Sequence, residues 1–226
     1  MRRFLTVLIH ILAILIPMAL GWGLNDLPEF FHQLPRACLI VAIFLGTLAI
    51  LVLRIDLNPL RTGAPAITRE GATLLVLAVC SIALLAFLPY ADRRGMPTIV
   101  HPSLHASARW LGLILTVIAG AVRILALRQL GPQFSAYVTL QPGHALVQTG
   151  IYSRIRHPLY LSLLLAGPGV ALVFASQLVW PILAVTIAFI ANRIKAEERL
   201  LAKHFGPQFQ SYRQHSSMLL PLFRVR

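Results

Sequence analysis

The chain has 226 residues, of which 58% are hydrophobic and only 12% are charged. A soluble globular domain carries about 25% charged residues, so the composition excludes an ordinary soluble domain and predicts an all-α integral membrane protein. The formal net charge of +13 would suit a nucleic-acid-binding protein, but the positions of the basic residues favour a membrane topology and no nucleic-acid partner.

Six apolar runs follow one another along the chain, and each is long enough, some barely, for a membrane helix of roughly 17–25 residues. The first run follows two arginines and also has features of a secretory signal, but the five further runs favour an uncleaved helix. We predict about six membrane-embedded helices, three of them within residues 1–106 and the others within residues 107–226. The six runs are Phe4–Leu24, Ala37–Leu53, Gly71–Leu88, Ser107–Leu127, Pro158–Phe174 and Gln177–Ile194.

The basic residues are distributed unevenly between the two sides of such a membrane. With the N-terminus inside, Arg36, Arg93, Arg94 and Arg109 lie outside and the other 16 of the 20 basic residues lie inside. This asymmetry follows the positive-inside rule, and the inner residues would contact anionic lipid. We therefore predict a multi-pass protein with both termini in the cytoplasm. Arginine outnumbers lysine 18 to 2, which indicates a bacterial protein of the inner membrane.

The first half of the chain shows little sign of chemistry. Cys38 and Cys80 lie within apolar runs, and no Cys/His spacing typical of a metal site occurs, so we predict no metal. His10 lies in the middle of the first run. Intramembrane ionisable residues are functional candidates, but we interpret this imidazole as a hydrogen-bonding partner of a neighbouring helix.

A polar, glycine-punctuated loop, QPGHALVQTGIYSRIRHPLY, occupies residues 141–160 and leads directly into the fifth apolar run. An interfacial belt of aromatic and basic residues would explain its tyrosines and arginines, but not its histidines or glycine spacing. Proline is favoured as the first residue of a helix, so the free amides after Pro158 would face the loop. The histidines and tyrosines are His144, Tyr152, His157 and Tyr160.

A second polar cluster begins at residue 192, where the sixth run ends. Arg193 and Glu197 are four residues apart and share one helical face, so the simplest interpretation is a pair that neutralises itself. Alternatively, Glu197 accepts hydrogen bonds from a ligand, and the guanidinium of Arg193 binds a substrate carboxylate or phosphate with two parallel bonds. Because the two runs would form a hairpin that turns at residues 175–177, both polar clusters return to the cytosolic face and indicate a pocket there.

Three motifs carry a resemblance to a known family: HALVQTGIYSRIRHPLYLS, EERLLAKHFGPQFQSY and the Leu220–Pro221 pair. Together they resemble the isoprenylcysteine carboxyl methyltransferase family, whose wider relatives include phospholipid methyltransferases. The resemblance extends from Gly131 to Pro221 and implies a membrane methyltransferase that binds S-adenosylmethionine in a cytosol-facing pocket, so that residues 107–226 would be the catalytic region. The loop between Phe134 and His144 is shorter than in eukaryotic members, which leaves their upstream glutamine contact without a counterpart, and Phe209 replaces a common tyrosine.

The resemblance also implies roles for individual residues. Arg193 would bind the substrate carboxylate. The cofactor contacts would be His144, Ala145, Leu146, Val147, Tyr152, His157, Pro158, Leu159, Tyr160 and Glu197.

The predicted reaction is methyl transfer to the carboxylate, or another polar head, of a lipophilic substrate such as isoprenylcysteine. A phospholipid amine and a lipophilic acid or thiol are also compatible acceptors, so the methylated atom stays open. One alternative is an NADPH-dependent membrane reductase of the sterol-reductase type, which has similar C-terminal helices. Another is a small transporter or a non-catalytic lipid-binding protein, although a transporter would place its polar residues near the middle of the membrane.

Overall fold

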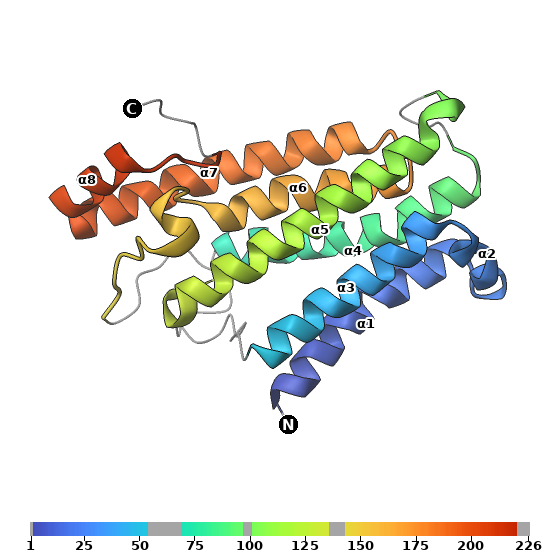
Figure 1. Ribbon diagram of the computed structural model, residues 1–226, viewed down its shortest axis with the longest axis horizontal. Coiled ribbons are helices and arrows are strands. Elements are labelled where there is room, and N and C mark those ends of the chain that lie inside the picture. The colour runs from blue at the N-terminus through green and yellow to red at the C-terminus, as the bar shows by residue number, and fades with distance from the viewer. Residues whose placement is uncertain (1, 54–68, 97–100, 136–142, 221–226) are drawn as a thin grey trace.

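The computed structural model describes residues 2–53, 69–96, 101–135 and 143–220 (Figure 1). Within these ranges the chain is mainly helical, and the described residues contain no β-strand, although an isolated parallel bridge joins Ile155 and Ser217. The all-α prediction is therefore confirmed. The α-helices are α1 (Arg2–Trp22), α2 (Leu27–His32), α3 (Leu34–Val52), α4 (Arg69–Arg93), α5 (His105–Leu130), α6 (Pro158–Val173), α7 (Val179–Phe205) and α8 (Pro207–His215), and the short 3-10 turns are η1 (Leu24–Asp26), η3 (Pro102–Leu104), η4 (Gly131–Gln133) and η5 (Gly150–Ser153).

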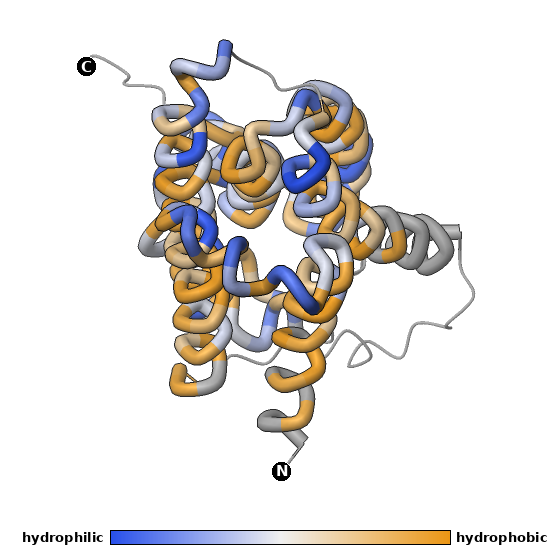
Figure 2. The backbone as a smooth tube through the Cα atoms, turned by 90° about the vertical axis from the view of Figure 1, so that its right-hand side faces the viewer, coloured by the Kyte–Doolittle hydropathy of each residue, from blue (hydrophilic) through white to orange (hydrophobic). Residues whose placement is uncertain are grey.

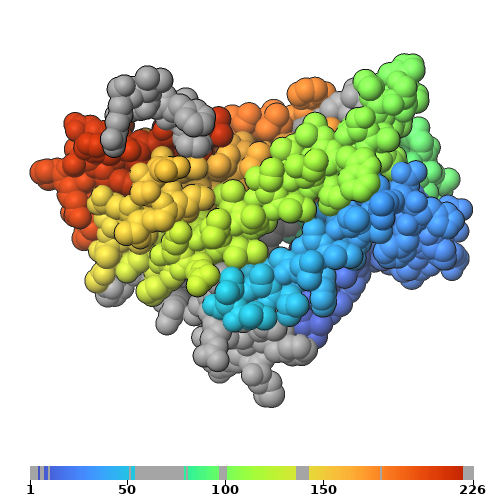
Figure 3. Space-filling view, viewed as in Figure 1, coloured from blue at the N-terminus to red at the C-terminus, as the bar shows by residue number. Residues whose placement is uncertain are grey.

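Each predicted apolar run corresponds to one long helix, and α2 and α8 are two short helices in addition. The long helices form two groups (Figure 1). In one group α5, α6 and α7 lie side by side, and in the other α1 packs against both α3 and α4. Helix α5 crosses the face of the molecule between the two groups (Figure 3), where α3 packs on it.

Small residues allow close helix contacts in both groups. A Cβ atom at Gly112 of α5 would lie 2.5 Å from the carbonyl oxygen of Gly169 in α6, and one at Gly169 would lie 3.0 Å from the carbonyl oxygen of Gly112. Gly21 of α1 approaches the backbone of Ala86 in α4 even more closely. Glycine permits such backbone contact between membrane helices, so Gly112 and Gly169 allow α5 and α6 to pack closely.

The helix bodies carry hydrophobic residues on most of their faces (Figure 2), including many that are exposed. Among the described residues one helix, α5 with its flanking turns, is long and apolar enough to cross a membrane. The helices over residues 11–22 and 24–32 meet at an angle of 89°, and this bent pair would be a second span if the two helices cross the membrane together. Helices α3 and α6 provide shorter apolar segments. The number of six membrane helices stays a prediction.

Two glycines and a tight turn bring the polar segments to one end of the molecule. Helix α6 and helix α7 form the predicted hairpin, with residues 174–178 as the turn. Gly206 ends α7 with a positive φ of 50°, and Pro207 then begins α8 beside α7. Gly131, with φ of 51°, ends α5 at the same end of the molecule (Figure 1).

An ion cluster, which we call the distal cluster, lies at the opposite end of α5. The carboxylate of Asp92 in α4 pairs with Arg36 of α3 at 2.7 Å and with Arg109 of α5 at 2.8 Å, and all three side chains are at least nine-tenths buried. The guanidinium of Arg36 also lies over the ring of Trp22, 4.5 Å from its centre. The distal cluster therefore joins α3, α4 and α5 to each other.

Two sequence interpretations concern side chains of the N-terminal half. Cys38 is a free thiol packed against the hydrophobic core, as expected for a small core residue. The side chains of His10 and Cys80 lie outside the described part of the structure, so their interpretations stay predictions.

Candidate functional site

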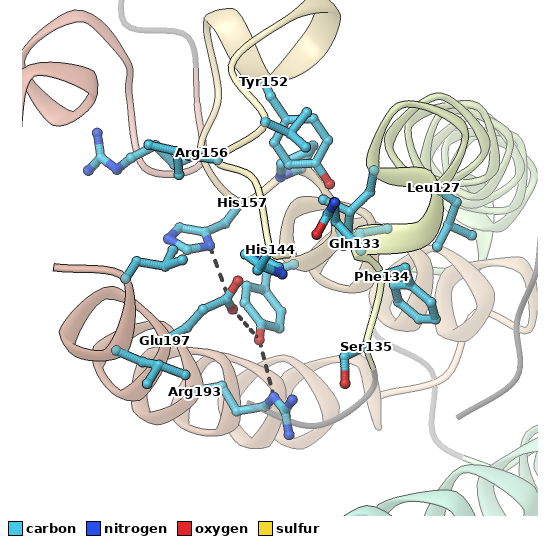
Figure 4. A pocket seen from close by; sticks show the side chains of 18 of the residues that line it. Leu127, Gln133, Phe134, Ser135, His144, Tyr152, Arg156, His157, Arg193 and Glu197 are labelled. Carbon is cyan, nitrogen blue, oxygen red and sulfur yellow. Dashed lines mark hydrogen bonds and ion pairs between the residues drawn. The ribbon is translucent and has the colours of Figure 1, made fainter. Parts of the chain in front are cut away.

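A cavity of about 340 Å³ lies where the C-terminal half of α7 meets the beginning of α6 and the end of α5. Its volume falls within the range of about 300–1,000 Å³ that small-molecule sites occupy. All the site residues predicted from the sequence line this one cavity (Figure 4), although their roles stay predictions. They are His144, Ala145, Leu146, Val147, Tyr152, His157, Pro158, Leu159, Tyr160, Arg193 and Glu197.

The phenol of Tyr160 connects the two polar residues of α7. Its hydroxyl donates to Oε2 of Glu197 at 2.9 Å and accepts from Nε of Arg193 at 3.2 Å. The guanidinium of Arg193 also lies over the ring of Phe189, 5.6 Å from its centre. The side chain of Glu197 remains 36% exposed. The hypothesis of a simple self-neutralising pair therefore omits Tyr160 and the cavity that all three residues share.

His157 immediately precedes α6 and is buried between two glutamates. Its Nε2 atom lies 3.2 Å from Oε1 of Glu198, whereas its Nδ1 atom lies 3.9 Å from Oε2 of Glu197. Its ring packs on the ring of Tyr160, with 5.6 Å between the centres. Since an α-helix has 3.6 residues per turn, adjacent residues project in different directions. Glu197 therefore faces the cavity, while Glu198, only 13% exposed, lies behind His157.

Side-chain amides at the end of α5 hold the loop that forms another wall of the cavity. Oε1 of Gln129 accepts a hydrogen bond from the amide of Ile151 at 2.7 Å, and Oε1 of Gln133 accepts one from the amide of Ala145 at 3.3 Å. Gly150 has a positive φ of 57°, and a Cβ atom there would overlap the amide group of Gln129. This glycine is therefore required where the loop meets α5.

His144 has a buried ring nitrogen without a partner. Its Nδ1 atom is fully buried and makes no hydrogen bond within the described residues. Burial lowers the pKa of His144, and the charge of His204 lowers it further, against an opposing effect of Glu197. The imidazole is therefore neutral at physiological pH and retains an unused hydrogen-bonding atom in the cavity wall.

Two buried tyrosines complete the side of the cavity nearest α8. Burial raises the pKa of Tyr152, with a further increase from the charge of Glu197, and burial raises the pKa of Tyr212 to about 12. Both phenols are therefore protonated at neutral pH. The hydroxyl of Tyr212 donates to the carbonyl oxygen of Tyr152 at 2.6 Å.

Several cavity residues were not identified from the sequence. Arg123 was not among the site residues predicted from the sequence, but the structure places it in the cavity lining with Leu127 and Leu130 of the same helix. Leu127 and Leu130 follow Arg123 by four and seven residues, and this helical spacing inside an apolar run could have indicated that the three share one face. Gln133, beside the shortened loop, also lines the cavity. Further lining residues are Phe134, Ser135, Arg156, Leu163, Phe189, Leu200, Leu201, Phe209 and Tyr212.

The described residues offer no group of three or more His, Cys, Asp or Glu side chains placed to bind a metal ion. The expected absence of a metal stays a prediction. The polar side chains that line the cavity are instead one carboxylate, three guanidiniums, two imidazoles, three phenols, one amide and one hydroxyl.

Comparison with known proteins finds similarity in this same region. Residues 111–203 match the sequence model of the isoprenylcysteine carboxyl methyltransferase (ICMT) family. The protein-S-isoprenylcysteine O-methyltransferase of Saccharomyces cerevisiae is 30% identical over 114 residues, which are 49% of this chain and 48% of the yeast protein. Protein-S-isoprenylcysteine O-methyltransferase A of Arabidopsis thaliana is 28% identical over 172 residues, covering 69% of this chain and 83% of the plant protein.

A solved structure of the eukaryotic intramembrane Ras methyltransferase ICMT has a similar fold. It matches with a TM-score of 0.57 and 20% sequence identity, over 93% of this chain and 73% of that one. At this identity the likeness concerns the fold alone. The chain spans about half the length of the yeast relative.

Proposed function

We propose that this chain is a membrane methyltransferase of the isoprenylcysteine carboxyl methyltransferase family, whose sequence model it matches over residues 111–203, and that it uses S-adenosylmethionine. The methyl acceptor is the carboxylate of a lipophilic molecule such as an isoprenylated cysteine. One observation carries the proposal: a single cavity contains the carboxylate of Glu197 and the guanidinium of Arg193 on one helix face, linked through Tyr160.

The residues of the cavity suit this cofactor. The half-exposed carboxylate of Glu197 is available to accept hydrogen bonds from hydroxyl or ammonium groups, and the unpartnered Nδ1 of His144 offers one more polar contact. Leu146, Tyr152 and Pro158 supply the apolar and aromatic wall that a nucleoside base needs. S-adenosylmethionine, when bound, supplies an electrophilic methyl group on a sulfonium whose departure leaves a neutral thioether.

The residues on the α7 side would orient the acceptor. A carboxylate is already a nucleophile and needs no general base, so the protein has to orient the reactants and exclude water. The guanidinium of Arg193, held by Tyr160 and stacked on Phe189, presents a planar fork that binds a carboxylate with two bonds. Orientation of this kind can contribute about 7–11 kcal/mol to lowering the barrier.

The proposal includes the placement of the enzyme in the membrane. The cavity opens on the cytosolic face, both termini lie in the cytoplasm, and the lipid tail of the acceptor enters between helices. Six spans in a bacterial inner membrane, in contact with anionic lipids, are the expected arrangement. The unequal distribution of basic residues along the chain supports this orientation.

The family match supports the methyl donor over the two alternative functions. A reductase would bind NADPH in the same cavity, so competition between the two cofactors separates these functions. A transporter would be expected to concentrate polar groups at mid-membrane, whereas the polar side chains of this cavity come from the loop before α6, from α8 and from the adjoining parts of α5, α6 and α7.

The decisive experiment incubates membranes with S-adenosylmethionine that carries a deuterated methyl group, with and without the protein, and analyses the lipid extract by mass spectrometry. We expect a labelled methyl ester of a lipophilic acid that depends on the protein and disappears in the Glu197→Ala variant. Labelled amines or thioethers would reassign the acceptor. Absence of any labelled product, together with binding of NADPH instead of S-adenosylmethionine, would overturn the proposal.

A further inference from the structure

Glu198 lies behind the cavity wall and binds several groups at once. Its Oε1 atom accepts a hydrogen bond from Nε of Arg156 at 2.9 Å and lies 3.2 Å from Nε2 of His157. Its Oε2 atom lies 3.6 Å from Nε of Arg213 in α8. Glu198 itself is absent from the cavity lining, but Arg156 and His157 both belong to it. The carboxylate therefore supports the wall from the side that faces away from the cavity.

The residues that Glu198 binds also form the attachment of the C-terminal segment, by which we mean residues 207–218. The backbone amides of Arg156 and His157 donate to the carbonyl oxygens of Ser217 and Met218 at 2.8 and 3.1 Å, and the amide of Ser217 donates back to the carbonyl of Arg154 at 2.9 Å. Nη1 of Arg156 donates to the carbonyl oxygen of Ser216. A short two-stranded contact therefore fastens this segment to the loop.

The C-terminal segment is itself part of the cavity wall. Phe209 is completely buried and Tyr212 is 7% exposed, and both line the cavity. The hydroxyl of Tyr212 donates to the carbonyl oxygen of Tyr152, which is a second contact between this segment and the loop. Loss of the attachment would therefore open the wall on the side of α8.

The contact with Glu198 also determines which nitrogen of His157 carries hydrogen. Burial alone would raise the pKa of Glu198, but hydrogen bonds from His157 and Arg156 and their charges outweigh it and lower the pKa to about 2. The carboxylate is therefore ionised at neutral pH and can only accept. Nε2 of His157 must then be the donor, and its Nδ1 atom is the one directed toward Glu197.

We propose that Glu198 is a positioning residue of the methyltransferase: its carboxylate fixes the orientation of His157 and holds Arg156 in the position where the C-terminal segment closes the cofactor cavity. This inference rests on the proposed function for its kinetic consequences, but the structural part stands without it. Glu198 acts through His157 and Arg156 and touches neither cofactor nor acceptor.

The test compares Glu198→Gln with the conservative variant Glu198→Asp and with the control Glu29→Gln, which removes the same charge from an exposed position of α2. The first readout is amide hydrogen exchange of the peptide over residues 153–160 in the purified protein without cofactor. Hydrogen bonds to charged groups are strong enough that we expect Glu198→Gln to accelerate exchange at Arg156 and His157 about tenfold or more. Glu198→Asp should restore part of the protection, and Glu29→Gln should match the original protein.

The second readout separates positioning from a general loss of folded protein. We expect Glu198→Gln to raise the KM and the Kd for S-adenosylmethionine about tenfold, with little change in the KM for the acceptor. A purely structural role would lower kcat through the folded fraction and leave both KM values unchanged.

A second variant, Tyr212→Phe, removes one hydroxyl from the same attachment and should produce a smaller change of the same kind, so the inference is still testable if Glu198→Gln does not fold. Unaltered exchange at residues 156–157 in both variants would overturn the inference. Altered exchange without any binding of S-adenosylmethionine by the original protein would instead overturn the proposed function and leave the attachment intact.

Discussion

The two ends of the molecule use the same ionic arrangement for different purposes. In the distal cluster the carboxylate of Asp92 lies between two arginines and joins α3, α4 and α5. At the end that contains the cavity, the carboxylate of Glu198 lies between Arg156 and Arg213 and joins the loop, α7 and α8. Each carboxylate connects separate segments of the chain, but the side chains of the distal cluster are at least nine-tenths buried, whereas Arg213 is 46% exposed.

The two ion clusters also differ in what lies next to the central carboxylate. Beside Glu198, one residue earlier on the same helix, the carboxylate of Glu197 remains 36% exposed in a cavity of about 340 Å³. The surroundings of Asp92 consist of a cavity about half as large, about 180 Å³, with mainly apolar lining residues. A buried ion pair by itself is therefore weak evidence for a functional site, and the accessible polar group beside it is the informative feature.

The largest effect is expected from Asp92→Asn. Removal of one partner from a buried ion pair leaves uncompensated charge and costs about 3–5 kcal/mol, and Nη1 of Arg109 already has no hydrogen-bond partner within the described residues. We expect the free energy of unfolding in detergent to fall by that amount, while the folded fraction binds S-adenosylmethionine with unchanged Kd.

The matched control for this variant is Asp26→Asn. Asp26 pairs with Arg93, and both side chains are 36% exposed; such exposed pairs contribute only about 0–1 kcal/mol. If Asp92→Asn were as stable as Asp26→Asn, the distal cluster would not stabilise the contact between α3, α4 and α5.

The next largest effect is expected from Glu197→Ala. Loss of a carboxylate that accepts hydrogen bonds from the cofactor costs about 1.5–3 kcal/mol, which corresponds to roughly 10–100-fold weaker binding of S-adenosylmethionine. Isothermal titration calorimetry measures this directly, with Glu29→Ala as the control for charge. Unchanged affinity would remove Glu197 from the cofactor site.

Arg193→Lys should have a smaller and more selective effect. Lysine keeps the charge but loses the planar fork, so we expect kcat to fall about tenfold while the Kd for S-adenosylmethionine stays within about twofold. Single-turnover kinetics and calorimetry on the same preparation separate the two quantities. If both stay normal, Arg193 has only a structural role.

The smallest effect is a pH dependence of stability. Because the folded state lowers the pKa of Glu198 from 4.5 to about 2, this carboxylate stabilises the folded protein above pH 4.5 and loses that contribution as the pH falls from 4.5 toward 2. The difference in Tm between the original protein and Glu198→Gln should therefore narrow between about pH 5 and about pH 3. A constant difference across this interval would contradict the assigned role of the charge.

The sequence predicted the cavity residues best where they are close together in the chain. His144, Tyr152 and His157 belong to one loop, and the apolar runs around it indicated that the loop and the end of α7 share a face of the membrane. Arg193 and Glu197 were expected to lie near each other from helical periodicity alone, and Tyr160 connects them.

Features that depend on helix rotation and packing were not predictable in this way. Arg123 joins the cavity only because α5 turns that face toward α6 and α7, and the topology rule that placed Arg36 and Arg109 outside gave no indication that both pair with Asp92. The separate roles of Glu197 and Glu198 likewise depend on the rotation of α7 about its axis. Local motifs therefore predicted the composition of the site, and tertiary packing determined its geometry.

The most direct test of the central claim is ultraviolet crosslinking of methyl-tritiated S-adenosylmethionine to the purified protein, followed by identification of the labelled peptides. We expect label in peptides over residues 143–163 and 193–201. This label should be lost when unlabelled S-adenosylmethionine, but not NADPH, is added in excess. Label confined to the region around Asp92 and residues 174–178, or no specific label anywhere, would contradict it.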